Sequence, residues 1–170
     1  YYKINPKGQV PALELPEGGY LTEGAIIMQY LADQRPESSL SAPAGSLERY
    51  RIMEWMSFIA SDLHKGAFMP LIKKVTPADY RPIARQLVLN RLQWLNDHLV
   101  DREYLTGSTF TIADAHCYTI AMWTAYQDID VSPWPHLKAY LKRIGARASV
   151  VAAKAAERRE AKRLGQEDRV

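Results

Sequence analysis

The sequence predicts an α+β chain that is mostly helical, and three observations lead to this fold class. Residues 9–22 contain two short apolar segments separated by a Gly-Gly pair, as a β-hairpin does. Residues 36–45 contain two Pro and three Ser, which is typical of a linker. After Gly45 the apolar residues recur with a helical period. We therefore expect a small unit in residues 1–35, a linker in residues 36–45 and an all-helical unit in residues 46–170.

The hairpin is expected as two short strands joined by a tight turn. Residues 9–15, Gln-Val-Pro-Ala-Leu-Glu-Leu, are interpreted as the first strand and residues 20–22 as its partner. Gly18 and Gly19 supply the turn, because glycine readily adopts the backbone angles that tight hairpin turns require.

A helix is expected directly after the hairpin. Its apolar residues fall at helical spacing: Ile26, Ile27, Tyr30 and Leu31. Thr22, immediately before Glu23, is expected to cap its first turn. The helix is expected to stop by Arg35, because a proline disfavours helical geometry in the residue before it.

Five more helices are expected after the linker. The first spans about residues 46–63, and its apolar residues cover more than one face, which predicts burial against both a core and a second subunit. The second spans about residues 77–100. The other three are expected to begin at Thr111, near Pro135 and, with a basic character, after Ser149.

The first unit is small for an independent fold. A two-stranded hairpin with one helix is only marginally stable by itself. The chain also begins without Met, inside a turn-like segment. We therefore expect a preceding segment of roughly 30–45 residues, about one βαβ unit.

Composition favours a folded protein of the cytoplasm. Hydrophobic residues make up 47% and charged residues 24% of the chain. No apolar run approaches the ~20 residues that cross a membrane, so no membrane association is expected. Cys117 is the single cysteine. Because it cannot form an internal disulfide, a reducing compartment is expected.

The net charge of +3 is concentrated near the end of the chain. Residues 142–170 contain nine Lys or Arg against four Asp or Glu. A basic end can bind nucleic acid, but this one has no aromatic residue that could stack on a base. We therefore expect a solvated terminal helix and no nucleic-acid partner.

Val10-Pro11 is the first pair with chemical interest. Proline lacks a backbone donor, so within a sheet it belongs at an edge or a bulge. A cis bond would turn the Val10 backbone outward, where an extended peptide could add as another strand. The residues alone favour a trans proline that ends a strand, because cis bonds are a small minority.

Glu23-Gly24 lies where a strand passes into a helix. The free backbone N–H groups there favour an anion, and the Glu23 carboxylate could accept an ammonium group. Together they would suit the zwitterionic end of an amino acid. The alternative is that Glu23 only offsets the helix dipole, and the residues alone favour it.

Four segments together resemble the glutathione S-transferase family, most closely its bacterial beta class. They are Asn-Pro-Lys-Gly-Gln-Val-Pro-Ala-Leu at 5–13, Leu-Thr-Glu-Gly-Ala-Ile-Ile-Met-Gln-Tyr-Leu at 21–31, Ile-Ala-Ser-Asp-Leu-His-Lys-Gly at 59–66 and Phe-Thr-Ile-Ala-Asp at 110–114. Each is weak by itself, but the ordered set covers nearly the whole chain. The resemblance implies the remnant of a thioredoxin-like domain, hairpin plus helix, followed by the family's all-α C-terminal domain.

The resemblance also implies a glutathione site. Pro11 is then cis, the Val10 backbone pairs with the cysteinyl unit of glutathione, and Glu23 with Gly24 holds its γ-glutamyl end. The family often has Ser where this chain has Gly24, so a side-chain hydroxyl contact would be missing here.

A polar stripe is expected on the helix around residue 60. Ser57, Ser61, His64 and Lys65 are spaced i, i+4, i+7 and i+8, which places them on one face of an α-helix. The matching positions of beta-class proteins border the glutathione site, some of them across the dimer interface. By resemblance, His64 lies near the thiol and Lys65 attracts the glycyl carboxylate. The alternative is an exposed polar face.

Thr111-Ile112-Ala113-Asp114 predicts a helix start. Thr111 would cap the helix while the Asp114 carboxylate reaches back to the Thr111 N–H, a structural role. Cys117 on the same helix is expected to be buried and inert. No metal site is expected, because His116 and Cys117 are adjacent and the other histidines lack ligand spacing.

The implied function is conjugation of glutathione thiolate to hydrophobic electrophiles, as in detoxification, by a homodimer with glutathione as co-substrate. A free thiol of pKa ~8.5 is little ionised at neutral pH, so such an enzyme needs an activating group. In the family, the activating group lies near the start of the first strand, so we expect it in the preceding segment. We therefore assign no catalytic residue in this chain. His64 is expected at most to assist the activating group. The alternatives are a glutathione-dependent thiol-disulfide or peroxide reductase and a non-catalytic interaction module.

Overall fold

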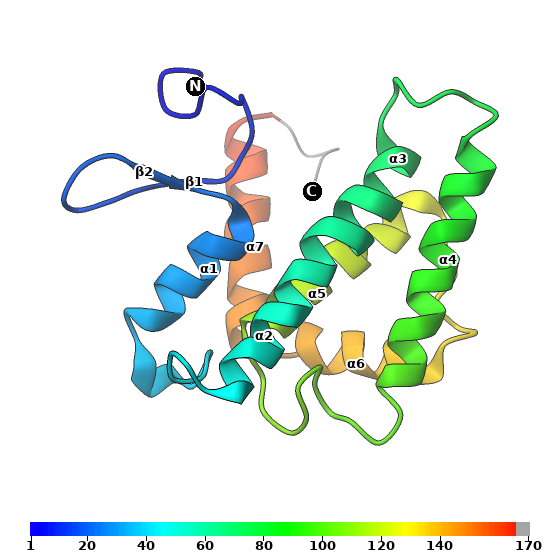
Figure 1. The fold of residues 1–170 in the computed structure, drawn as a ribbon. Helices are drawn as coiled ribbons and strands as arrows, with labels where there is room; N and C mark the ends of the chain where they lie inside the picture. The colour runs from blue at the N-terminus through cyan, green and yellow to red at the C-terminus, as the bar shows by residue number, and fades with distance from the viewer. Residues whose placement is uncertain (166–170) are drawn as a thin grey trace.

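The computed structural model describes residues 1–165 of the chain as a small hairpin unit beside a bundle of helices (Figure 1). The fold is mostly helical with one two-stranded sheet, as the sequence predicted. The last residues of the predicted helical unit and of its basic end, 166–170, lie outside the described part of the chain.

The hairpin consists of β1 (Ala12–Glu14) and β2 (Tyr20–Thr22), paired antiparallel with Leu13 opposite Leu21. Gly18 and Gly19 form the turn with positive φ angles of 92° and 84°, which only glycine adopts without strain. The predicted first strand is too long at its start. Pro11, directly before β1, has no N–H to offer to a ladder.

Helix α1 (Gly24–Asp33) follows β2 and ends before Pro36, as predicted. The predicted cap is wrong. Thr22 is the last residue of β2, and Glu23 occupies the cap position with φ 70° and without a side-chain capping bond. A positive φ in a residue other than glycine is uncommon and often marks a functional segment.

The predicted linker contains one short 3₁₀ helix, Pro36–Ser38. Hydrogen bonds attach the linker and the end of α1 to the helical bundle. Arg49, which is 8% exposed, donates to both carboxylate oxygens of Asp33 at 2.6 and 2.9 Å and to Ser41 Oγ at 2.7 Å. The Leu40 carbonyl accepts a hydrogen bond from the Ile112 N–H. These bonds fix residues 1–35 against the helical bundle.

The first helix of the bundle is longer than the predicted 46–63. It begins as α2 (Leu47–Phe58), capped by the Ser46 hydroxyl, which accepts from the Arg49 N–H at 3.1 Å. It continues as the π-helix η2 (Ile59–Phe68) and ends as α3 (Met69–Ile72). A π-helix is rare and frequently lies at a functional site.

The remaining helices follow the predicted order. Helix α4 begins four residues after the predicted Pro77, because residues 77–80 form a turn. A short 3₁₀ helix, η3, was not predicted. The bounds are α4 (Arg81–His98), α5 (Ile112–Ala121), η3 (Met122–Gln127), α6 (Pro135–Gly145) and α7 (Ala148–Arg163).

The core lies between the long helix, α4, α5 and α6 (Figure 1). Its fully buried side chains include Leu63, Phe68, Leu92, Leu95 and Tyr140. Burying apolar surface of this kind is the main stabilising term in folding. The core therefore holds η2 and α5 in fixed positions, and both helices contribute to the site below.

The predicted start of α5 is confirmed. Asp114 Oδ2 accepts from the Thr111 N–H at 2.8 Å, and Asp114 Oδ1 accepts from the Leu105 N–H at 2.9 Å and from the Tyr140 hydroxyl at 3.1 Å. Burial still raises the pKa of Asp114. Cys117 is fully buried, as predicted, and burial raises the pKa of its thiol to about 12.

Candidate functional site

A cleft of about 560 Å³ lies where the loop before β1, the start of α1, η2 and α5 meet. Seven of the eight predicted glutathione residues line it, namely Val10, Pro11, Glu23, Gly24, Ser61, His64 and Lys65. The rest of its lining is Asn5, Gln9, Ala25, Ile27, Met28, Ala60, His116, Thr119 and Ile120. The cleft is therefore lined by residues from both predicted units, residues 1–35 and the helical unit after the linker.

The Val10-Pro11 bond is cis, which confirms the expectation drawn from the resemblance. Val10, directly before this bond, is 80% exposed and lines the cleft. The loop before it is held by Asn5, which is buried. Its side chain donates to the Gln9 carbonyl at 2.6 Å and accepts from the Lys7 N–H at 3.2 Å.

Asn5 was assigned no role in the sequence analysis. The signal was present in the Asn-Pro-Lys-Gly segment, since Asn often bonds backbone groups two residues on and so shapes a turn. Only the structure shows that its side chain spans the loop and lines the cleft.

Glu23 and Gly24 lie at the N-terminus of α1, where the first backbone N–H groups have no partner inside the helix. The Lys7 ammonium donates to Glu23 Oε1 at 2.5 Å, and both side chains are more than half exposed. This hydrogen bond and the charge of Lys7 lower the pKa of Glu23. The carboxylate is therefore ionised and already has one cationic neighbour.

A side chain in place of Gly24 would fit. A Cβ there would meet only the Pro11 ring, at 3.6 and 3.7 Å, which is ordinary van der Waals contact. Lack of space therefore does not explain why this chain has Gly where the family it resembles often has Ser.

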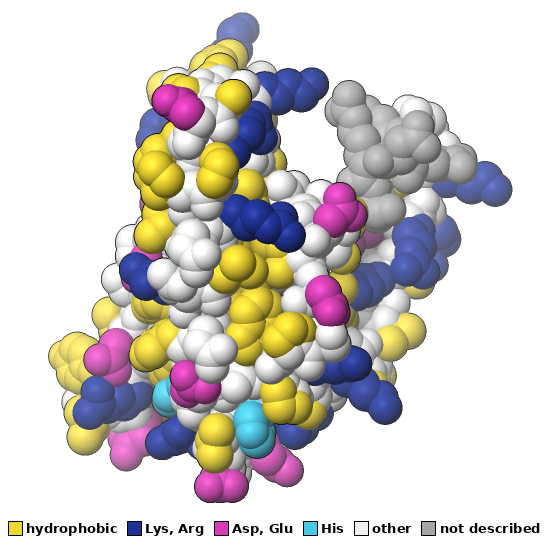
Figure 2. Space-filling view, turned by 90° about the vertical axis from the view of Figure 1, so that its right-hand side faces the viewer, with side chains coloured by type: hydrophobic (Ala, Val, Ile, Leu, Met, Phe, Trp, Pro, Cys, Tyr) yellow, Lys and Arg dark blue, Asp and Glu magenta, His cyan; other side chains and the backbone are white. Residues whose placement is uncertain are grey.

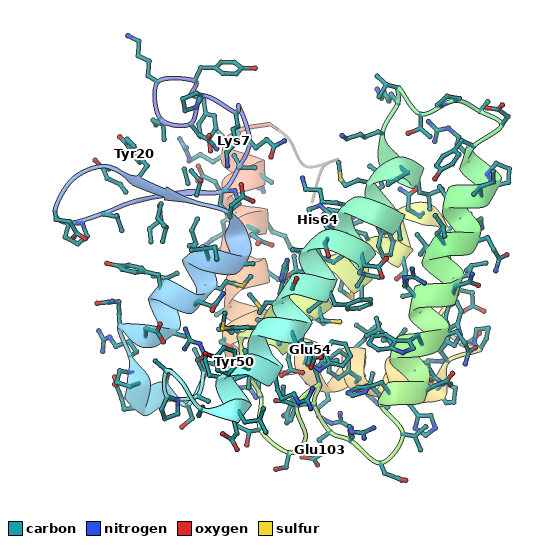
Figure 3. The ribbon with its side chains drawn as sticks, in the orientation of Figure 1. Lys7, Tyr20, Tyr50, Glu54, His64 and Glu103 are labelled. Carbon is teal, nitrogen blue, oxygen red and sulfur yellow. The ribbon has the colours of Figure 1, made fainter. Side chains whose placement is uncertain are left out.

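His64 and Lys65 line the cleft from η2. His64 lies in the same upper half of the view as Lys7 (Figure 3). The His64 ring packs edge-to-face on Trp123, with ring centres 4.9 Å apart. Burial, and to a smaller extent the charge of Lys65, lowers the pKa of His64. His64 is therefore a neutral imidazole at pH 7. The positive charge that η2 contributes to the cleft is that of Lys65.

Ser57 is the predicted site residue that does not line the cleft. It is exposed on α2, and its carbonyl accepts a hydrogen bond from the Ser61 hydroxyl at 2.8 Å. The prediction assumed one α-helical face through residue 65, but the helix changes to π geometry at Ile59. The spacing therefore does not place Ser57 on the same helix face as Ser61, His64 and Lys65. A role for Ser57 across a dimer interface stays a prediction.

His116 on α5 is a cleft residue that the sequence analysis considered only as a metal ligand and dismissed. Burial, and to a smaller extent the nearby His64, lowers the pKa of its ring to about 4. Among residues 1–165, no group of three or more His, Cys, Asp or Glu could hold a metal ion.

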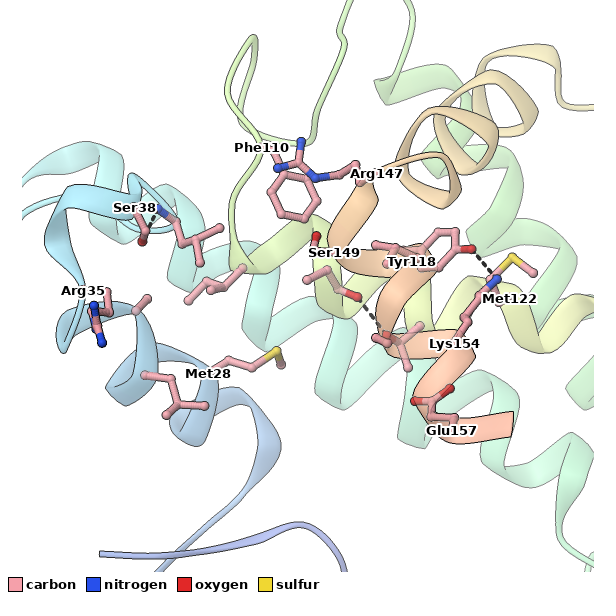
Figure 4. Close-up of a pocket in the computed structure, with 18 of the residues that line it drawn as sticks. Met28, Arg35, Ser38, Phe110, Tyr118, Met122, Arg147, Ser149, Lys154 and Glu157 are labelled. Carbon is pink, nitrogen blue, oxygen red and sulfur yellow. Dashed lines mark hydrogen bonds between the residues drawn. The ribbon is translucent and has the colours of Figure 1, made fainter. Parts of the chain in front are cut away.

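A second cavity, of about 840 Å³, lies between α1, α5 and α7 (Figure 4). Its lining includes Tyr118, whose hydroxyl accepts from Lys154 Nζ at 2.6 Å, and Arg147, whose guanidinium lies 3.7 Å from the centre of the Phe110 ring. None of the eight predicted glutathione residues lines it. The smaller cleft is therefore the candidate site.

Two protein-family models match parts of the chain. The model of the family "Glutathione S-transferase, C-terminal domain" matches residues 59–148, and that of "Glutathione S-transferase, N-terminal domain" matches residues 1–34. The chain is 43% identical over 157 residues to the glutathione S-transferase GstA of Escherichia coli O157:H7, an alignment that covers 92% of this chain and 78% of the relative.

Two solved structures are similar over 92% of this chain and 77% of their own. One is a sphingomonad glutathione S-transferase complexed with glutathione, 41% identical with a TM-score of 0.88. The other is a bacterial beta-class glutathione S-transferase of Sphingomonas chungbukensis, 42% identical with a TM-score of 0.88.

Proposed function

Because the chain belongs to the glutathione S-transferase family, we propose that it transfers the thiolate of glutathione to electrophilic small molecules. The observation that supports this most is the cleft, which collects seven residues expected to bind glutathione from three separate segments of the chain. A similar structure is described as a complex with glutathione.

Each end of glutathione has a complementary group in the cleft. The γ-glutamyl ammonium binds the Glu23 carboxylate, and the γ-glutamyl carboxylate binds the N–H groups at the start of α1. The backbone of Val10, a mostly exposed residue, pairs with the cysteinyl unit as an added strand would. Lys65 attracts the glycyl carboxylate, which places the thiol on the side of His64.

The reaction needs an ionised thiol, and His64 assists that step as a neutral hydrogen-bond donor. We assign none of the described residues the role of the main activating group. Cys117 is unsuited to a reductase mechanism, because its buried thiol has a pKa of about 12 and the thiolate is the reactive form.

We further propose that the chain forms a homodimer through α2 and α4. Leu47, Tyr50 and Met53 leave an apolar stripe exposed on α2. On α4, exposed Trp94 packs on Phe58. Figure 2 shows hydrophobic side chains on the α4 side of the molecule. Exposed apolar side chains in such numbers are typical of a protein–protein interface.

We also propose that the chain has the three expected parts and that the protein is cytoplasmic. Residues 1–35 form the glutathione-binding unit, residues 36–45 the linker and the residues after them the helical domain. Within residues 1–165, none of the helices is long and apolar enough to cross a membrane.

The proposed function is tested by calorimetry with glutathione and by conjugation of glutathione to a chloronitrobenzene, both in the complete protein. Saturable glutathione binding and conjugate formation are expected. Glutathione-dependent reduction of a small disulfide without conjugation would favour the reductase instead. Absence of glutathione binding would favour a non-catalytic interaction module.

A further inference from the structure

We propose that His116 is a further binding residue of the glutathione cleft, and that its Nε2–H donates a hydrogen bond to the thiolate sulfur of bound glutathione. This inference rests on the proposed function, because it concerns the same cleft and the same ligand. It adds a residue from a third wall of the cleft, α5, to those contributed by the hairpin unit and η2.

The position of His116 supports a contact with ligand. Helix α5 packs against both α1 and η2, and its residues 116, 119 and 120 line the cleft together with residues of those two helices. The ring is mostly buried but retains some exposure, and His64 is near enough to perturb it electrostatically. His116 therefore lies beside the residue that is expected to be near the thiol.

The two ring nitrogens of His116 have different surroundings. Nδ1 is buried and has no hydrogen-bond partner among the described residues. Nε2 is not among those buried atoms and forms no hydrogen bond to residues 1–165. A buried N–H without an acceptor is the rarer and costlier arrangement, so the proton belongs on Nε2 and Nδ1 keeps its lone pair. The cleft therefore receives an N–H donor.

The ring stays neutral at the pH at which the reaction runs. Burial and the neighbouring His64 hold its pKa at about 4, and Lys65 supplies the positive charge of the adjacent wall. A neutral imidazole of this pKa does not compete for the thiol proton. It serves only as a donor.

The glutathione sulfur is the acceptor that remains for the His116 N–H. In the proposed pose the γ-glutamyl group, the cysteinyl backbone and the glycyl carboxylate already have partners in Glu23, Val10 and Lys65. A thiolate is an anion, and hydrogen bonds to charged groups are the stronger ones. A neutral donor beside it favours the ionised thiol without removing its proton.

The test titrates the thiolate absorbance of glutathione bound to the complete protein, in wild type, His116→Phe and His116→Gln. His116→Phe removes the donor and should raise the pKa of the bound thiol by about one unit, a tenfold change in its ionisation. His116→Gln can place an amide N–H near the position of Nε2 and should restore most of the lost ionisation. Phenylalanine also removes the unpartnered Nδ1, so the thermal midpoint of His116→Phe without ligand should not fall.

The outcomes separate this inference from the proposed function. If wild-type protein fails to bind glutathione in calorimetry, both are overturned. If wild type binds glutathione and all variants titrate alike, only the role of His116 is overturned. If His116→Phe does not fold, His116→Asn replaces it, because its amide is too short to reach the Nε2 position. Equal titration of His116→Asn and His116→Gln would then overturn the proposal.

Discussion

Lys7 Nζ lies 2.5 Å from Glu23 Oε1, and the same ammonium is 3.4 Å from the Thr22 hydroxyl. The carboxylate proposed to receive the glutathione amine is therefore ion-paired already. Lys7 lies in the loop that Asn5 holds, so the loop that presents Val10 and the start of α1 are joined through this pair.

Lys7→Met should make glutathione binding more sensitive to acid. Lys7 lowers the pKa of Glu23, so in wild type the carboxylate stays ionised, and able to bind an ammonium, to lower pH. Without Lys7 the pKa of Glu23 rises, and affinity should start to fall at a higher pH. Calorimetric titrations from pH 6 down to pH 4 measure this, with Lys3→Met as the matched control. Identical pH profiles in the two variants would contradict it.

Glu23→Gln should weaken glutathione binding by roughly 10- to 100-fold, because a hydrogen bond between charged groups is worth ~1.5–3 kcal/mol. The loss should appear mainly in the Michaelis constant for glutathione, since the thiol is at the other side of the γ-glutamyl unit. Glu17→Gln in the hairpin turn is the control. Unchanged affinity would leave Glu23 only its interaction with the helix dipole.

His64→Ala should affect turnover more than the Michaelis constant for glutathione, the opposite of Glu23→Gln. If the ring donates to the sulfur, turnover should fall roughly 10- to 100-fold while glutathione affinity changes less. Steady-state kinetics separate the two effects, and exposed His136 offers a control substitution to Ala. A rise in the Michaelis constant alone would place His64 away from the sulfur.

Tyr50→Glu should dissociate the proposed homodimer. Tyr50 is 58% exposed in the middle of the α2 stripe, and a charge there would be buried without a partner in the interface. Light scattering at micromolar concentration should give twice the chain mass for wild type and the chain mass for the variant. Val151→Glu, at a similarly exposed apolar site on α7, should leave the mass unchanged. A wild-type protein of single-chain mass would refute the dimer itself.

Asp114→Ala should lower the free energy of unfolding by roughly 3–5 kcal/mol, because two buried N–H groups and the Tyr140 hydroxyl lose their acceptor. Thr111→Val, which removes only the hydroxyl contact, should cost about 1 kcal/mol. Denaturant unfolding measures both. Similar losses in the two variants would show that the carboxylate has no special role.

The sequence was sufficient to predict most of the fold because its signals are local. Pro36 and Pro135 limit helices, the Gly18-Gly19 turn defines the hairpin, and Thr111 with Asp114 marks a helix start. The long helix continues past the predicted residue 63 and through Gly66, although glycine is a poor helix former. In the π-helix Gly66 approaches the Ser61 carbonyl, which a Cβ would meet at 3.2 Å.

The candidate site was predicted as far as it is built from short segments. Val10 with Pro11 and Glu23 with Gly24 are neighbours in sequence, so their pairing could be seen. His116 reaches the cleft only because α5 packs against α1 and η2, and no local pattern reports that contact. The capping role of Thr22 failed for a similar reason, since nothing in the sequence indicates the positive φ of Glu23.

The buried guanidinium of Arg49, clamped on Asp33, has a consequence for the thermodynamics of binding. It joins residues 1–35 to the bundle through two residues that do not line the cleft, so the walls of the cleft are held relative to each other before any ligand binds. A preorganised cleft loses little conformational entropy when it is filled. Glutathione should therefore associate without a slow conformational phase, and Arg49→Met should weaken binding although Arg49 itself does not line the cleft.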